Sequence, residues 1–398
     1  MKKLFLSLVM IAFAVGLSGS YSTPKVKIED LKLASFIEKT IFSSERVEKE
    51  FKVKSGQKLT IDLQTGGEIR IESWEKEMVK VTAIFGGRDA EDIDLEFDES
   101  PLGILITTDY YGRNNNRSSN IRFEIMVPKK FDVDFETMGG DIRINGVEGE
   151  LEGTTMGGEL ELNNLKGYVS MTTMGGAITL SDSEVEGKVK TMGGSVTLEN
   201  IVGDVDASSM GGKVTQKNVK GKKGTIGKEL HMSTMGGAIT VDDAPNGAYL
   251  KTMGGSIEVK SAGIFVEAET MGGGIDIDAI DGWIKAKTMG GDVRVTMVGD
   301  PKKGERDVTL TSMGGDIELA VPDGLDMEID IEIAFTKKYE GDVEIYSDYK
   351  IEKEISKEWE YDHGSKRKYL TGTGKVGSGK NKIKIRTING NVYINKSK

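Results

Sequence analysis

Lys-Val-Lys-Thr-Met-Gly-Gly-Ser-Val-Thr-Leu-Glu-Asn-Ile-Val-Gly-Asp-Val, at residues 188–205, is one copy of a repeat that decides the fold of this chain. Its Thr-Met-Gly-Gly motif, with Ser replacing Thr twice, occurs ten times. Seven of the nine intervals between successive motifs are 18 residues, and the other two are 25 and 24. Such a strict period is typical of a solenoid with two insertions. The motif methionines are Met138, Met156, Met174, Met192, Met210, Met235, Met253, Met271, Met289 and Met313.

Apolar and polar residues alternate around each motif. Val196 and Leu198 follow the Gly pair of the quoted copy, and the first of these two positions is aliphatic in all ten copies. Such alternation with β-branched residues predicts a half-buried strand. In the strand that precedes the motif, the inward residues are Val189 and Thr191, so the inward set changes from odd to even numbers at Met-Gly-Gly. We predict a corner there, in which Gly permits a positive φ or a bulge.

Stacking of these coils predicts an all-β fold, a single-stranded parallel β-solenoid (β-helix) with 18-residue coils about 4.8 Å apart. Equivalent residues then form ladders along the stack. The Thr hydroxyls are expected to hydrogen-bond to one another, and the Met side chains to fill a gap at the corner. Three central copies of this structural ladder are Thr155, Met156, Gly157, Gly158, Thr173, Met174, Gly175, Gly176, Thr191, Met192, Gly193 and Gly194.

The N-terminus predicts export. Lys2 and Lys3 precede an apolar run and the small residues 18–20, a pattern typical of a secretory signal peptide over residues 1–20. An uncleaved membrane anchor is the alternative, although a span needs about 20 apolar residues. We expect no transmembrane span after signal removal. The other predicted segments are a linker or short helix at 21–47, an N-terminal β region of the solenoid at 48–130, the regular repeats at 131–320 and a C-terminal β cap at 321–398.

Composition argues against several functions. The net charge of −11 becomes −13 without residues 1–20, which carry two Lys and no acid, and this disfavours nucleic acid as a partner. With no Cys and two His, the chain lacks Cys–His catalysis and zinc clusters. The residue after each Gly pair varies too much for rows of calcium ligands. The methionines could bind Cu(I) through their thioethers, but gap filling is the favoured interpretation, so we predict no cofactor, no metal and no catalytic residues.

Motifs outside the repeats resemble a known family. They are Leu-x-Ile-x-Leu-x-Thr-Gly-Gly-x-Ile-x-Ile at 59–71, followed by Trp74 and Val79–Val81, then Ile125–Pro128 and Thr387–Val392. With these motifs the sequence resembles the bacterial putative-adhesin family of unknown function, whose fold is a β-solenoid related to autotransporter adhesin head-like domains. The resemblance covers nearly the whole chain after residue 20. It implies the fold and supplies no catalytic residue, and this chain departs from it in its near-invariant Met.

Two sets of residues are candidates for partner binding. Three aromatic residues lie five positions before a motif, where Phe265 and Trp283 should stack on the surface. They could bind sugars or a partner strand, or simply cover the neighbouring coil. Both insertions are basic and should share one edge, four coils or about 19 Å apart, as an anionic-partner site or as solvated loop tips. The candidates are Tyr168, Phe265, Trp283, Lys220, Lys222, Lys223, Lys302, Lys303 and Arg306.

The predicted function is therefore a non-catalytic, exported β-solenoid that acts as an adhesin-like binding or scaffold protein of the cell envelope. It would be periplasmic, exposed on the cell surface or secreted. Its partner would be an envelope or surface protein or polysaccharide, and self-association is possible. Two alternatives remain, a self-assembling structural element and a carbohydrate-active enzyme built on a β-helix.

Overall fold

The computed structural model describes residues 46–87, 92–111, 119–221, 227–362 and 364–397. Within these ranges, 31 strands form one hydrogen-bonded sheet, accompanied by a single-turn 3-10 helix, η3 (Lys337–Tyr339). The prediction of an all-β chain is confirmed. The predicted signal peptide lies outside the described residues, as does the 21–47 segment except for Arg46 and Val47, which begin the first strand. No helix in the described ranges has the length and apolar character needed to cross a membrane.

The first seven strands mix parallel and antiparallel pairing. β2 and β3 pair in parallel with strands of the first coil, whereas β1–β4, β4–β7 and β5–β6 are antiparallel. β1 and β5 are outer strands rich in charged residues, which discourages pairing with another sheet edge. These strands are β1 (Arg46–Lys52), β2 (Lys58–Leu63), β3 (Glu68–Trp74), β4 (Met78–Gly87), β5 (Ile93–Ser100), β6 (Gly103–Tyr110) and β7 (Ser119–Pro128).

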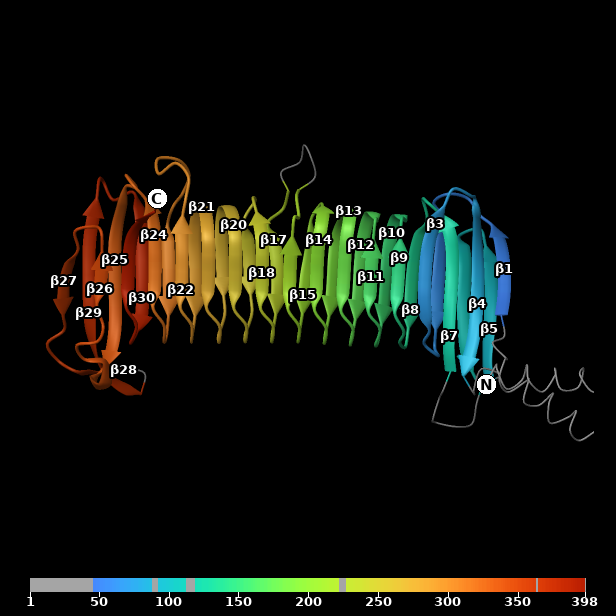
Figure 1. Cartoon of the computed structure of the whole chain (residues 1–398), viewed down its shortest axis with the longest axis horizontal. Coiled ribbons are helices and arrows are strands. Elements are labelled where there is room, and N and C mark those ends of the chain that lie inside the picture. Colours follow the sequence, from blue (N-terminus) through green and yellow to red (C-terminus); the bar gives the residue numbers. More distant parts are fainter. Residues whose placement is uncertain (1–45, 88–91, 112–118, 222–226, 363, 398) are drawn as a thin grey trace, which may run out of the picture. The chain divides into compact units, whose positions relative to one another are not determined.

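The central strands pair only in parallel, each with the equivalent strand of a neighbouring coil, and the coils follow one another in sequence order from green to orange in Figure 1. Paired residues are 18 apart between regular coils, as in Thr173↔Thr191, and 25 apart across the first insertion, as in Ala207↔Met232. These strands are β8 (Asp132–Thr137), β9 (Ile142–Asn145), β10 (Glu148–Thr155), β11 (Leu160–Asn163), β12 (Lys166–Thr173), β13 (Ile178–Thr191), β14 (Val196–Val202), β15 (Val205–Ser209), β16 (Val214–Lys217), β17 (Leu230–Thr234), β18 (Ile239–Ala244), β19 (Ala248–Lys251), β20 (Ile257–Glu269), β21 (Ile275–Thr288), β22 (Val293–Met297), β23 (Val308–Ser312) and β24 (Ile317–Pro322).

The last strands are again mixed. β30 and β31 extend the parallel stack from β23 and β24, and β29 pairs antiparallel with β25, β27 and β28. The sheet is therefore mixed rather than parallel throughout, because hairpins replace coils at both ends. These strands are β25 (Met327–Thr336), β26 (Ile345–Ser347), β27 (Glu352–Ile355), β28 (Glu360–Asp362), β29 (Ser365–Val376), β30 (Asn381–Ile388) and β31 (Val392–Ser397).

The predicted inward residues of the repeats lie in the core. Val196 and Leu198 are fully buried, and Val189 is 1% exposed. Gln216 occupies a position that is aliphatic in the other copies, and it is also buried. Its amide nitrogen donates to the Asp243 carbonyl at 3.0 Å, and its amide oxygen accepts from the Asp242 N–H at 3.0 Å. Both polar ends of this side chain are thus satisfied inside the coil.

A second corner of the coil uses a different chemistry, carried by residues that recur at the same 18-residue interval. Asn164, Asp182, Asn200 and Asn218 occupy it in successive coils with positive φ of 49–56°. Asn and Asp tolerate this left-handed conformation better than other non-Gly residues. Their side chains also join neighbouring coils, since the Asn200 amide donates to Asp182 at 2.9 Å and the Asn218 amide to Asn200 at 2.8 Å.

The Thr ladder is buried as expected, but its hydroxyls bond to the backbone rather than to one another. The Thr191 hydroxyl donates to the Gly176 carbonyl of the preceding coil at 2.7 Å and accepts from the Gly194 N–H at 3.2 Å. Ser209 makes the same two contacts one coil later. The expected hydroxyl-to-hydroxyl ladder is therefore wrong, because the tight corner brings backbone groups closer to each hydroxyl.

Replacing Thr191 by Val should lower the free energy of unfolding by about 2 kcal/mol, since it leaves the half-buried Gly176 carbonyl and Gly194 N–H without this partner. Thr191→Ser is the matched control and should stay within about 1 kcal/mol of the native chain, because Ser209 makes the same contacts naturally. Urea denaturation followed by circular dichroism measures both. Equal stabilities of the Val and Ser variants would show that the hydroxyl contributes nothing.

The Gly pair has a different role from the one predicted. Among the twenty triplet glycines, only Gly140 has a positive φ, at +100°. The need for Gly arises from close approach between coils. A Cβ atom on Gly194 would lie 2.2 Å from the Gly176 carbonyl oxygen and 2.4 Å from its carbon. The corner exists, but Gly is required there because neighbouring backbones nearly touch.

Candidate functional site

A groove forms where the first insertion interrupts the stack. β13 and β15 pair from Gly187↔Val205 onward, whereas the pairing of β15 with β17 begins only at Ala207↔Met232. Because of the insertion between β16 and β17, the pairing of β15 with β17 starts two residues later than its pairing with β13. The strands diverge there and leave a hollow between them.

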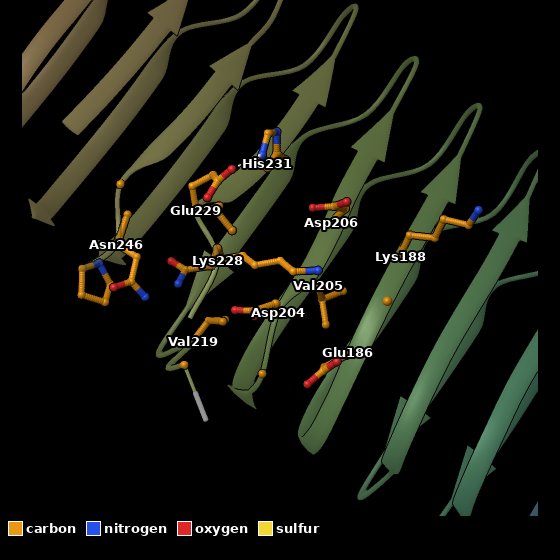
Figure 2. A pocket seen from close by; sticks show the side chains of 18 of the residues that line it. Glu186, Lys188, Asp204, Val205, Asp206, Val219, Lys228, Glu229, His231 and Asn246 are labelled. Carbon is orange, nitrogen blue, oxygen red and sulfur yellow. Dashed lines mark ion pairs between the residues drawn. The ribbon is translucent and has the colours of Figure 1, made fainter. Parts of the chain in front are cut away.

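Three adjoining hollows make up this groove. The first, of about 360 Å³, lies beside the insertion, and Figure 2 shows Lys188 and Lys228 around it together with Asp204, Asp206 and Glu229. The second, of about 570 Å³, continues along β15 and β17 past Ser208 and Ser233. The third, of about 280 Å³, shares Lys190, Ser208, Ser233 and Lys251 with the second and ends at Met210, Met235 and Met253.

The groove carries charges of both signs. The Lys251 ammonium lies 3.1 Å from the Glu269 carboxylate. Glu229 has a lowered pKa because its carboxylate accepts a backbone hydrogen bond and lies near His231. In the second hollow, the Glu267 carboxylate accepts a hydrogen bond from Lys285 and raises the pKa of that lysine. In the described ranges, no group of three or more His, Cys, Asp or Glu side chains is placed to hold a metal ion.

Four rings form a row, and two of them, His231 and Tyr249, line the second hollow of the groove. Phe265 and Trp283 stack as predicted, with centroids 4.9 Å apart and planes 12° apart. Tyr249 lies 4.9 Å from Phe265, and His231 stacks on Tyr249 at 4.9 Å. The sequence pattern does not reveal these two members, because they lie three residues before their motifs whereas Phe265 and Trp283 lie five before theirs.

Phe265 covers backbone of a neighbouring coil and offers little exposed ring surface to a ligand. Phe265 has a ring on either side and is only 9% exposed. It also lies over Gly247, where a Cβ atom would meet the ring at 2.3 Å. These contacts favour the coil-cover interpretation for Phe265, since sugars bind to exposed ring faces. Tyr168 is separate from the stack: it is 39% exposed, pairs with Glu186 across β12 and β13 and lines the first hollow.

The basic candidates divide into three groups. Lys220, Lys302 and Lys303 are exposed, and the described parts of both insertions lie at the same edge of the sheet in Figure 1. Lys222 and Lys223 lie outside the described residues.

Arg306 is buried, which contradicts its prediction as a binding residue. It is 1% exposed, and its guanidinium donates to the carbonyls of Val298 at 2.7 Å and Lys303 at 3.0 Å. It also pairs with Asp281. Its positive charge therefore closes the second insertion onto the stack and is not available to a partner.

The Met row is also placed differently from the prediction. All ten motif methionines are 40–55% exposed. They do not fill a gap at the corner, because the second Gly of each triplet lies directly against the backbone of the neighbouring coil and the Met side chains lie on the outer side. The corner instead turns each thioether toward solvent. The groove and this row of ten methionines, termed the Met row, are the two unusual surfaces of the regular stack.

A model of the Toastrack DUF4097 family matches residues 26–395. A search of curated proteins finds no match. Among solved structures, a putative cell adhesion protein from Clostridium sporogenes ATCC 15579 is 9% identical with a TM-score of 0.19, covering 89% of this chain and 100% of its own.

Two further structures are similar to the chain. A putative adhesin from Parabacteroides merdae ATCC 43184 is 11% identical with a TM-score of 0.38, and the match covers 65% of this chain and 98% of that one. A putative adhesin from Bacteroides fragilis NCTC 9343 is 17% identical with a TM-score of 0.31, and the match covers 62% of this chain and 98% of that one.

Proposed function

This chain belongs to the Toastrack DUF4097 family, and from that premise we propose that it is an exported, non-catalytic β-solenoid with 18-residue coils that binds a partner as an adhesin-like protein of the cell envelope. The signal-like residues 1–20 support export to the periplasm, the cell surface or the medium. The partner is a protein or polysaccharide of the envelope or of a surface that the cell meets.

The groove is the observation that carries this proposal. The groove begins beside the first insertion and continues along β15, β17 and β19, and it presents serine hydroxyls, ammonium groups and carboxylates along one continuous path. Such a path offers hydrogen-bond donors and acceptors to an extended polar polymer. Lys220 and Lys228 lie beside its opening and would attract anionic groups of that polymer.

One carboxyl of the groove, that of Glu229, does not suit a glycosidase acid. A general acid in a glycosidase needs a carboxyl whose pKa is raised toward neutrality. The pKa of Glu229, which lines the first hollow, is instead lowered by its hydrogen bonds. This carboxylate stays ionised at neutral pH and serves as a hydrogen-bond acceptor.

Filling the groove should abolish partner binding. Ser208 and Ser233 are neighbours across β15 and β17, so Ser208→Trp with Ser233→Trp should block the second hollow and weaken retention on the partner more than tenfold. The matched control is Thr197→Trp with Thr215→Trp, a neighbouring pair on β14 and β16. Retention of the full chain on immobilised envelope polysaccharides and on purified surface proteins is measured by surface plasmon resonance.

The possible results distinguish an error in the binding site from an error in the proposed function. Loss in both double variants points to a partner surface wider than the groove, and equal binding of all three chains excludes the groove. If none of the immobilised polymers retains the native chain, the adhesin-like function is wrong. Sedimentation of the native chain tests self-assembly, which would show as a concentration-dependent mass.

A further inference from the structure

Met occupies its motif position in every copy of the repeat, although another outward-facing position nearby varies. The motif position holds Met in ten of ten copies, whereas the residue directly after the Gly pair is variously Asp, Glu, Ala, Ser, Lys or Gly. Both positions face outward, so interior packing does not explain the difference. An exposed position that always holds Met, and never Leu, Ile or Val, points to the thioether rather than to apolar bulk.

Backbone hydrogen bonds hold the row in register. The Met174 N–H donates to the Thr155 carbonyl at 3.0 Å, and the Met192 N–H donates to the Thr173 carbonyl at 3.1 Å. Neighbouring methionines therefore start from positions about 4.8 Å apart, the spacing of adjacent strands. Their flexible side chains can adjust the sulfur positions further.

This spacing matches the bonding of a soft metal ion. With metal–sulfur bonds of about 2.3 Å, as in zinc thiolates, two sulfurs on opposite sides of one ion lie about 4.6 Å apart. Neutral thioethers are soft ligands that favour Cu(I) over hard cations such as Mg²⁺ or Ca²⁺. Two methionines of adjacent coils can thus hold one ion between them.

Three members of the row already surround a common space. Met210, Met235 and Met253 line the third hollow of the groove, of about 280 Å³. Two lysines line it as well, and one of them, Lys251, is paired with Glu269. The hollow therefore gathers three thioethers from three successive coils.

We propose that the Met row binds soft monovalent ions, Cu(I) or Ag(I), each held by the thioethers of adjacent coils. The site is independent of the partner proposed for the groove, because the row continues beyond the groove in both directions. Met138 through Met192 lie before the groove, and Met271 through Met313 lie after it.

Two variants with equal numbers of methionines test the bridging geometry. The alternating variant changes Met156, Met192, Met235, Met271 and Met313 to Leu, so every remaining row methionine has leucine neighbours. The block variant changes Met138, Met156, Met174, Met192 and Met210 to Leu and leaves five adjacent ones. Both retain the six described methionines outside the row, of which Met171, Met232, Met297 and Met327 are buried.

The full chain is titrated with Ag(I) in chloride-free buffer by native mass spectrometry, and with Cu(I) anaerobically against a chromophoric chelator. We expect three or more ions on the native chain, about half as many on the block variant and at least a tenfold loss of affinity in the alternating variant. Equal losses in the two variants would rule out bridging, and a native chain that takes up neither ion would overturn the proposal. Thermal unfolding verifies that both variants fold, which is expected because Leu and Met have similar volume.

Discussion

Replacing Gly158 by Ala should lower the free energy of unfolding by about 3 kcal/mol or more, a size reserved for severe packing conflicts. A Cβ atom at this position would lie 1.7 Å from the Gly140 carbonyl oxygen and 2.1 Å from its carbon. Both atoms belong to the backbone of the preceding coil, so no side-chain rotation relieves the clash. The two coils must separate, and separation breaks hydrogen bonds along β8–β10 and β9–β11.

The neighbouring glycine is the matched control. A Cβ atom on Gly157 would have a single neighbour, the Gly139 Cα at 3.7 Å, which is ordinary van der Waals contact. Gly157→Ala should therefore change stability by less than about 1 kcal/mol. Neither residue has a positive φ, so an explanation by backbone conformation alone predicts the same effect for both. Because a repeat stack can unfold in parts, hydrogen exchange of β9–β11 is measured together with urea denaturation, and equal protection in the two variants would contradict the close-approach explanation.

Arg306→Met should destabilise the chain by about 3 kcal/mol, because the buried guanidinium is a charged hydrogen-bond donor to two carbonyls of the second insertion. The substitution keeps an apolar side chain of similar length, but the Val298 and Lys303 carbonyls lose their donor. The Asp281 side chain is 56% exposed, so water can hydrate its carboxylate after the ion pair is lost, and this limits the loss of stability. We expect the second insertion to open away from β23.

Lys302 and Lys303 provide the control for Arg306. Both belong to the same insertion and are exposed, so Lys302→Met and Lys303→Met should each change stability by less than about 0.5 kcal/mol. Thermal unfolding followed by circular dichroism measures all three variants. If Arg306→Met were as stable as the two lysine variants, the basic residue would have no structural role, and its prediction as a contact residue would regain support.

Local sequence patterns predicted which face of a strand each residue of the repeat occupies. The inward positions of Val196, Leu198 and Thr191 follow from alternation alone, because successive side chains point to opposite faces. The contact of Phe265 with Trp283 follows from the 18-residue interval between them. Where the interval between motifs changes, the sequence no longer gives the pairing register between neighbouring strands. The divergence of β15 from β17, and with it the groove, depends on how a 25-residue coil closes.

The repeated motif by itself determined that this chain is all-β and which residues face inward, since both follow from periodicity along the chain. Only the tertiary structure decided what the motif does. The second Gly is needed because two backbones approach within the space of one Cβ atom. The Thr hydroxyl bonds to a carbonyl 15 residues earlier, and the Met side chain is turned toward solvent. These three outcomes depend on which atoms of neighbouring coils meet at the corner, and the spacing of the motifs along the chain does not give that.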